Sequence, residues 1–218
     1  MLIQIDPSAV KNFLRLKKRR LLGKENKDDL TPRQYKGRRF SGLIVKDSAI
    51  QTGRPIEQCP HYRGTLQRFQ EGLSWDQTEY AGLYDSWYRQ MNDQQYHSKS
   101  FEEFYSHRLQ TWDALFEDIK NNGFKASDSA RDNIEIAIDF SGRLLLIDGR
   151  HRLAMAQILE LETVPATVNI ISESFARAFT GHVPRIEKQL ATEEPKERMW
   201  IACKSANPKL QNLNEDRP

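Results

Sequence analysis

The sequence predicts an α+β fold, in which a small mixed sheet carries a helical insertion. Short apolar runs of strand-like character lie near the N-terminus and again between residues 134 and 168. Between these two regions, large apolar side chains recur at helical spacing up to Asn122-Gly123, a typical helix stop. A chain of 218 residues can bury a real core, so we expect one embellished domain over residues 1–200.

Residues 1–50 are expected to form a strand and a basic helix. Leu2–Ile5 is a short apolar run, and Asp6-Pro7-Ser8 is a typical helix start, from which we expect a helix to about Leu22. Residues 23–37 are charged and rich in turn formers, which indicates an exposed loop, and Leu43–Val45 fits a second strand.

Residues 55–124 are expected to form the helical insertion. Ser74 with Gln77, and Ser100 with Glu103, have the spacing of capping boxes at helix starts. A helical stripe of large apolar residues follows the second of these: Phe101, Phe104, Tyr105, Leu109, Trp112, Leu115, Phe116 and Ile119.

Residues 125–172 are expected to form the core of the domain. Ile134–Ile138 and Leu144–Ile147 read as two strands, and Ser141-Gly142 between them fits a two-residue hairpin turn. A helix is expected from Arg150 to Leu159, and a further strand at Val164–Val168. The core is followed by a predicted helix over 173–190, broken at Pro184, within a C-terminal segment 173–200, and then by a polar tail at 201–218.

The most informative segment is Asp148-Gly149-Arg150-His151-Arg152, where a predicted strand turns directly into a predicted helix. Backbone N–H groups at a helix start have no partner within the helix, and the helix dipole makes this end positive. Such an end is a ready anion site, and two arginines and a histidine add side-chain donors that suit phosphate. The segment therefore predicts a phosphate-binding site at Gly149, Arg150, His151 and Arg152.

This pattern resembles the core of the ParB/sulfiredoxin superfamily over residues 125–172. The similarity consists of a strand, a tight turn, a second strand, the Asp-Gly-Arg-His-Arg loop, a short helix and the Val164-Pro165 strand. Members include partition proteins that bind CTP, sulfiredoxins that use ATP, and kinases of free serine. The resemblance thus implies a nucleotide, ATP or CTP with Mg²⁺, while fold analogy alone does not select the chemistry.

Departures from the family pattern limit which of the family's functions we expect for this chain. Sulfiredoxins need a cysteine within the loop, where this chain has Arg150; the two cysteines are Cys59 and Cys203. Only 46 residues follow Ser172, so we do not expect the helix-turn-helix domain of a partition protein. Met155 replaces a small residue of the pattern, and Glu160 replaces the glycine that normally ends the helix.

Each residue of the segment has a functional and a structural interpretation. Asp148 would position Mg²⁺ or take a proton from the acceptor, or it is a turn residue or helix cap. His151 would donate to phosphate or to the leaving oxygen, or it pairs with a backbone carbonyl. Arg152 would grip two phosphate oxygens, or it forms an ion pair with Asp139 or Glu135. The side chain of Arg150 would bind phosphate or point outward.

Charge and composition suggest partners and location. Residues 1–40 hold 12 Lys and Arg against 4 Asp and Glu, with a basic run from Lys11 to Lys24. This run is either a solvated helix face or a contact surface for nucleic acid or another anion. No apolar run is long enough to span a membrane, and two distant cysteines favour a reducing cytoplasm without a zinc site.

A second unusual segment, residues 71–80, gathers Trp, Asp, Thr, Glu and Tyr at a helix start, where it lines a substrate pocket or forms a capped helix with a core tryptophan. We expect a nucleotide-binding protein that transfers phosphate to a small hydroxyl compound, with Asp148 and His151 as catalytic residues. The alternative is a non-catalytic, nucleotide-gated module that binds DNA or a partner. Whether the chain is an enzyme stays open.

Overall fold

The computed structural model describes residues 2–16, 43–86, 100–127 and 133–180. These residues form two compact units, which are described separately. The sheet unit comprises Met1–Pro55, Ala126–Gly149 and Glu162–Pro218, and the helical unit comprises Ile56–Lys125 and Arg150–Leu161. The chain leaves the sheet unit at Gly149 and enters the helical unit at Arg150, so the passage from one to the other falls inside the 148–152 segment.

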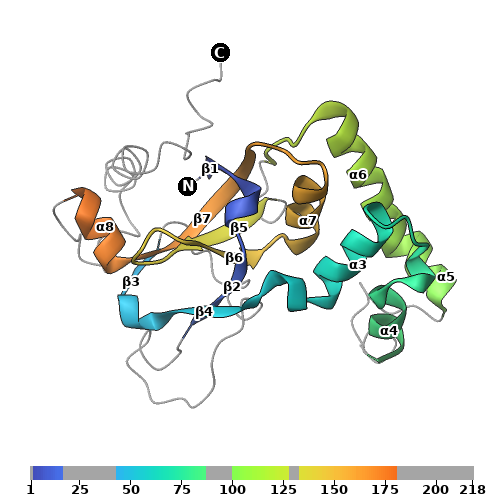
Figure 1. Cartoon of the computed structure of the whole chain (residues 1–218), viewed down its shortest axis with the longest axis horizontal. Coiled ribbons are helices and arrows are strands. Elements are labelled where there is room, and N and C mark those ends of the chain that lie inside the picture. Colours follow the sequence, from blue (N-terminus) through green and yellow to red (C-terminus); the bar gives the residue numbers. More distant parts are fainter. Residues whose placement is uncertain (1, 17–42, 87–99, 128–132, 181–218) are drawn as a thin grey trace. The chain divides into compact units, whose positions relative to one another are not determined.

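Within the described residues, the sheet unit contains one mixed sheet of seven strands (Figure 1). Six strands are ordered β1-β7-β5-β6-β2-β4. Strand β3 pairs with the last three residues of β7, beyond the residues with which β1 pairs. Neighbours are parallel in the pairs β2–β6, β3–β7 and β5–β7 and antiparallel in β1–β7, β2–β4 and β5–β6. The bounds are β1 Leu2–Ile5, β2 Asn12–Leu16, β3 Leu43–Val45, β4 Ile50–Pro55, β5 Ile134–Ile138, β6 Leu144–Asp148 and β7 Val164–Ser172; the helix α8, Glu173–Thr180, follows β7. This arrangement confirms the α+β class and the mixed sheet.

The sheet is built mainly from aliphatic side chains. β5 and β7 are buried along almost their full length, as expected for strands with neighbours on both sides. On one face of the sheet, a cluster of buried residues joins strands β2, β3, β4, β5, β6 and β7: Leu14, Leu16, Val45, Ala49, Ile50, Ala137, Leu145, Ile147 and Ile170.

The predicted basic helix from Asp6 is wrong over its described part. Asp6 does cap a helical turn, η1 (Pro7–Ala9), but the chain then becomes extended and forms β2. In β2 the side chains of Leu14 and Leu16 are buried and that of Arg15 is exposed, which is the two-residue period of a strand. Backbone pairing with β4 and β6 holds this segment in the sheet. Lys17–Lys24, most of the basic run, lies outside the described residues.

The turn between β5 and β6 differs from the prediction by one residue. Gly142 N–H donates to the carbonyl of Asp139, so Phe140 and Ser141 occupy the centre of the turn. Gly142 follows with a φ of +84°, a backbone conformation that favours glycine. The hairpin therefore needs a longer connection than the two-residue turn that Ser141-Gly142 suggested.

The helical unit contains α3 (Pro60–Phe69), α4 (Glu79–Ser86), α5 (Phe101–Phe104), α6 (Gln110–Asn122) and α7 (Arg150–Ile158), with short turns η3 (Ile56–Gln58) and η4 (Trp75–Gln77). A π-helical turn, η6 (Tyr105–Leu109), joins α5 to α6 without a break. The N–H of Gln110 donates to the carbonyl of Tyr105, five residues back.

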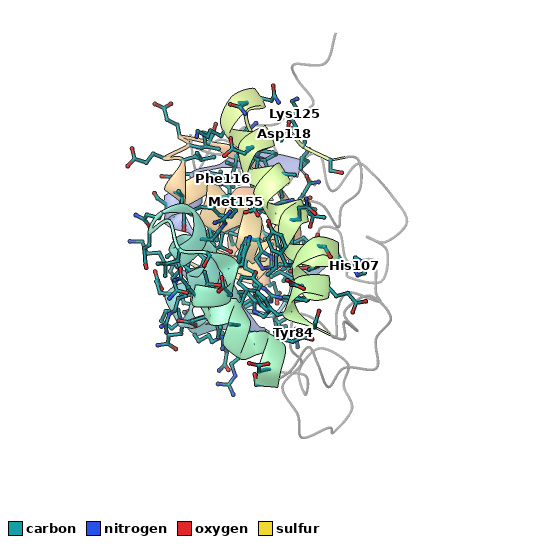
Figure 2. All side chains as sticks on the ribbon, turned by 90° about the vertical axis from the view of Figure 1, so that its right-hand side faces the viewer. Tyr84, His107, Phe116, Asp118, Lys125 and Met155 are labelled. Atoms are coloured by element: carbon teal, nitrogen blue, oxygen red, sulfur yellow. The ribbon has the colours of Figure 1, made fainter. Side chains whose placement is uncertain are left out.

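The core of the helical unit is aromatic. One cluster contains Trp75, Tyr80, Tyr84, Phe104 and Leu109, and a second contains Phe116, Ile119 and Met155. Phe69 stacks on Phe116 with ring centroids 4.1 Å apart. Figure 2 labels Phe116 on α6 and Met155 on α7, which belong to the second cluster. The large side chain of Met155 therefore packs between α7 and the long helix α6.

Candidate functional site

Asp148 and Gly149 lie at the exit of the sheet unit. Asp148 is the last residue of β6, half-buried, and its register partner across the antiparallel pair is Glu135. The side chain of Glu135 also accepts a hydrogen bond of 2.8 Å from Asn169 on β7. Two acidic residues therefore stand side by side on neighbouring strands, although the described residues contain no group of three or more His, Cys, Asp or Glu that could hold a metal ion.

Gly149 is required by both its conformation and its surroundings. Its φ of +87° is strained for any residue with a side chain. A Cβ at this position would lie 2.9 Å from Cα of Ile134 and 3.2 Å from the carbonyl oxygen of Asn133, both backbone atoms that cannot move aside. The predicted tight turn from strand to helix is therefore present, and only glycine fits it.

Helix α7 begins immediately after this turn, at Arg150, as predicted. Its buried face is made of Leu153, Ala154, Met155 and Ala156, which anchor it within the helical unit. Arg150, His151 and Arg152 form its first turn, and each is half-buried. The N–H groups of this turn have no acceptor within the helix, so the backbone and three basic side chains share one helix end.

His151 is held in an aromatic surround of the helical unit. Its Nε2 is hydrogen-bonded to the hydroxyl of Tyr80, and its ring lies on Trp112 at a centroid distance of 4.3 Å. The ring of His61 is 5.7 Å away at a steep angle. These contacts come from α3, α4 and α6, so three helices fix the position of one imidazole.

The same surround sets the charge of His151. Burial lowers the pKa of this imidazole well below 6.5, and electrostatic interactions with Arg150, His61, Arg108 and Arg152 lower it further. His151 is therefore neutral at neutral pH, and Tyr80 already occupies its Nε2. Only Nδ1 of the imidazole is then left to contact a ligand. We therefore regard His151 mainly as a residue that positions its neighbours.

The arginines of the segment have different surroundings. Arg152 places its guanidinium 6.0 Å from the ring centre of Trp112, and Arg108 of the π-helical turn lies 5.4 Å from the same centre. The Nε of Arg150 is buried and makes no hydrogen bond to any described residue. Asp139, one of the expected partners of Arg152, instead binds Arg143 through Nε at 2.6 Å.

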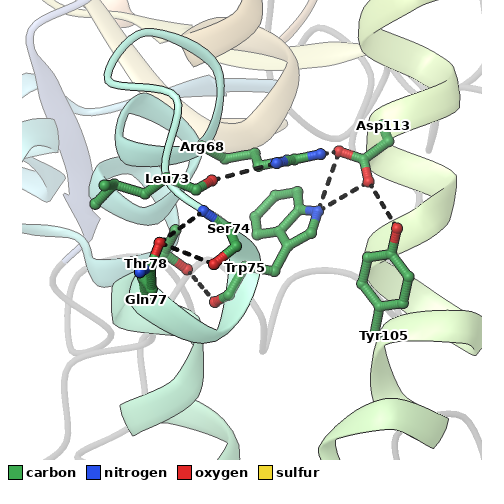
Figure 3. Close-up of polar contacts among 8 residues, drawn as sticks. All are labelled: Arg68, Leu73, Ser74, Trp75, Gln77, Thr78, Tyr105 and Asp113. Atoms are coloured by element: carbon green, nitrogen blue, oxygen red, sulfur yellow. Dashed lines mark hydrogen bonds and ion pairs between the residues drawn. The ribbon is translucent and has the colours of Figure 1, made fainter.

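In segment 71–80 the structure shows the capped helical turn with a core tryptophan, which is one of its two predicted interpretations. Ser74 N–H donates to Oε1 of Gln77, as in a capping box, and the ring of Trp75 is buried in the aromatic core. Figure 3 shows that the indole N–H of Trp75 donates to Asp113, which also accepts from Arg68 and Tyr105. At the end of the segment, Tyr80 reaches His151, so the segment contributes to the candidate site through one residue.

Two residues of this arrangement do not follow from the sequence: Arg108 and Trp112. The helical stripe did place Trp112 on an inward face, but no local spacing shows that this face meets α7. His107, which lies within the helical stripe of large apolar residues, is exposed (Figure 2). The π-helical turn causes this, because buried Phe104 and Leu109 are five residues apart, and the wider turn carries the residues between them outward.

The structure gives no indication of thiol chemistry in the 148–152 segment. Cys59 is a buried, free thiol at the start of α3, with Sγ 4.0 Å from Nδ1 of His61. Cys203 lies outside the described residues. None of the helices in the described part of the chain is long and apolar enough to cross a membrane.

No protein-family model matches the chain, and no curated protein or solved structure is significantly similar to it. The ParB/sulfiredoxin resemblance of residues 125–172 therefore stays a prediction.

Proposed function

We propose that the first turn of α7 binds the phosphates of a nucleoside triphosphate, ATP or CTP, together with Mg²⁺. The observation that carries this proposal is the passage from β6 through Gly149 directly into α7, whose first turn bears Arg150 and Arg152. Gly149, where a side chain would not fit, lets the backbone make this turn, and the N–H groups at the helix start have no acceptor within the helix. The Nε of Arg150 is buried and lacks a hydrogen-bond partner among the described residues. Because buried donors are usually paired, this supports a ligand that supplies the acceptor.

The proposed reaction is transfer of the terminal phosphoryl group to a small hydroxyl compound. The hydroxyl oxygen bonds to the γ-phosphorus, the bond from this phosphorus to the β–γ bridging oxygen breaks, and the nucleoside diphosphate leaves with the electron pair. Asp148 takes the proton of the acceptor or holds the metal, and Arg152 offsets the negative charge on the phosphates.

The acidic residues of the sheet unit fit a magnesium ion. Mg²⁺ is usually held by one or two carboxylates together with phosphate oxygens and water, and Asp148 and Glu135 are two such groups in register on β6 and β5. The ion would neutralise charge on the phosphates when it is bound. Asp148 is the residue we expect to hold it.

Binding is tested by thermal unfolding with MgATP and MgCTP. Either nucleotide should raise the melting temperature, since ligand at about 100 times its Kd stabilises the native state by about 2.7 kcal/mol. Arg152→Ala should lose this rise, whereas Arg177→Ala should keep it, because Arg177 is an exposed arginine of α8 paired with Glu173. Equal rises in the wild type and in Arg152→Ala would refute the site.

Catalysis is tested by measuring nucleoside diphosphate release with a panel of small alcohols. Asp148→Asn should keep part of the thermal shift, because the helix start and Arg152 still bind the phosphates, and should lose turnover at least about a hundredfold, the usual effect of removing a general base. If the wild type binds nucleotide but turns over none of the panel, and if binding alters its affinity for DNA, the non-catalytic module is the correct reading.

A further inference from the structure

Arg108 and Arg152 come from distant parts of the chain but share one aromatic platform in the helical unit. Their guanidiniums lie 5.4 Å and 6.0 Å from the centre of the Trp112 ring. Both side chains are half-buried, so each keeps a part of its surface in contact with solvent. Both guanidiniums therefore lie beside the same indole ring, where one anion can contact the two of them.

The ring of Trp112 also contacts His151. The imidazole lies on Trp112 with ring centroids 4.3 Å apart, and Tyr80 holds its Nε2. Because this imidazole is neutral, it adds no further positive charge beside the arginines. Three guanidiniums, those of Arg108, Arg150 and Arg152, therefore act around a single neutral ring.

The backbone at Arg108 is itself unusual. Arg108 lies in the π-helical turn η6, where the chain departs from α-helical geometry inside an otherwise continuous helical run. Such turns are costly and occur frequently at functional sites. In this case the wide turn lets Phe104 and Leu109 both enter the core while Arg108, one residue earlier, reaches Trp112 four residues further on.

We propose that Arg108 is a third phosphate-binding arginine, and that with Arg150 and Arg152 it makes the α7 site selective for chains of two or more linked phosphates. This inference rests on the proposed phosphate site and adds its ligand class. A linear triphosphate carries more negative charge than a single phosphate and distributes its oxygens over a greater length, so it can contact the helix start and all three guanidiniums.

The experiment uses phosphates without a base or sugar. Binding of orthophosphate, pyrophosphate and tripolyphosphate to the whole chain is measured by calorimetry and by tryptophan fluorescence. In the wild type, affinity should rise from orthophosphate to tripolyphosphate. Arg108→Gln should weaken tripolyphosphate about tenfold or more, as expected for loss of one hydrogen bond between charged groups, and change orthophosphate less than about twofold.

Arg63→Gln is the matched control, since Arg63 is another half-exposed arginine of the helical unit, paired with Glu79 on α4. This variant should bind all three phosphates like the wild type. Circular dichroism and the melting temperature without ligand show whether Arg108→Gln is folded, and Arg108→Lys should recover part of the tripolyphosphate affinity if charge is what matters.

The outcomes separate this inference from the proposed function. If Arg152→Ala abolishes tripolyphosphate binding and Arg108→Gln leaves it unchanged, the phosphate site stands and the role of Arg108 is refuted. If Arg108→Gln weakens all three phosphates equally, selectivity for linked phosphates is refuted. If the wild type binds neither tripolyphosphate nor nucleotide, the proposed function fails and this inference fails with it.

Discussion

Each unit of the molecule has an aspartate that collects several donors, and the two differ in where those donors come from. Asp139 in the sheet unit accepts from Ser141 and Arg143, which are two and four residues away. Asp113 in the helical unit accepts from Arg68, Trp75 and Tyr105, two of which are 45 and 38 residues away (Figure 3). The first network closes a turn, and the second joins three parts of the unit.

This difference explains what the sequence could predict. The turn that Asp139 organises is visible locally as Asp-Phe-Ser-Gly, because Asp, Ser and Gly have specific roles in turns. Nothing near Asp113 shows that it accepts from an indole and a guanidinium, since the partners meet only after the helices pack. Local interactions are therefore predictable in the sheet unit, whereas the organising contacts of the helical unit are not.

The largest effect is expected from Asp113→Ala. Removing the carboxylate leaves the buried indole N–H of Trp75 without its acceptor and frees Arg68, at a cost of about 2–3 kcal/mol in the free energy of unfolding. Denaturant unfolding monitored by tryptophan fluorescence measures it. Asp113→Asn keeps one acceptor oxygen and should cost less; equal losses in both variants would show that charge, rather than the indole contact, stabilises the unit.

Asp139→Asn should have a smaller effect, about 1–2 kcal/mol, because the turn keeps its backbone bond from Gly142 to residue 139. Burial alone raises the pKa of Asp139, but hydrogen bonds from Ser141 and Arg143 outweigh it and hold the pKa below its usual 3.8. The stabilisation of the folded state by the Asp139 carboxylate is thus present above about pH 3.8 and is lost as the pH falls further.

Comparison of acid unfolding in the wild type and in Asp139→Asn checks this sign. The difference in stability between them should shrink as the pH falls below 3.8, where the wild-type carboxyl becomes protonated. A difference that stays constant through this range would mean that the carboxylate charge does not stabilise the turn.

The sequence predicted the sheet better than the site. Strands β1, β3, β5, β6 and β7 are predicted from short apolar runs, and α7 from the segment after Gly149. Around Phe13 and Leu16 the sequence instead predicts a helix, because Asp6-Pro7-Ser8 signals a helix start and five residues hold too few apolar positions to separate the two periods. At the site, Arg150 and Arg152 follow from the local pattern, whereas Tyr80 and Trp112 depend on packing between helices.

The last and smallest effect concerns Glu160, which replaces the glycine that ends this helix in the resembling family. Glu160 has a φ of +51° and is, among the described residues, the one non-glycine residue with positive φ. Its N–H donates to the carbonyl of Gln157 and that of Leu161 donates to Ala156, the paired bonds of a Schellman motif. The helix therefore ends in the way that is typical of a C-terminal glycine, but the residue in the left-handed backbone conformation is a glutamate.

Glu160→Gly should consequently raise the free energy of unfolding by about 0.5–1 kcal/mol. The strain energy that glycine relieves in the folded state exceeds the entropic stabilisation that it gives to the unfolded chain. Glu160→Ala removes the charge but keeps the strain, so it should give no such gain. Glu162→Gly, two residues further on at an exposed position without positive φ, should be neutral or destabilising. Denaturant midpoints distinguish these outcomes, and a gain in Glu160→Ala equal to that in Glu160→Gly would assign the effect to charge and contradict the strain at this helix end.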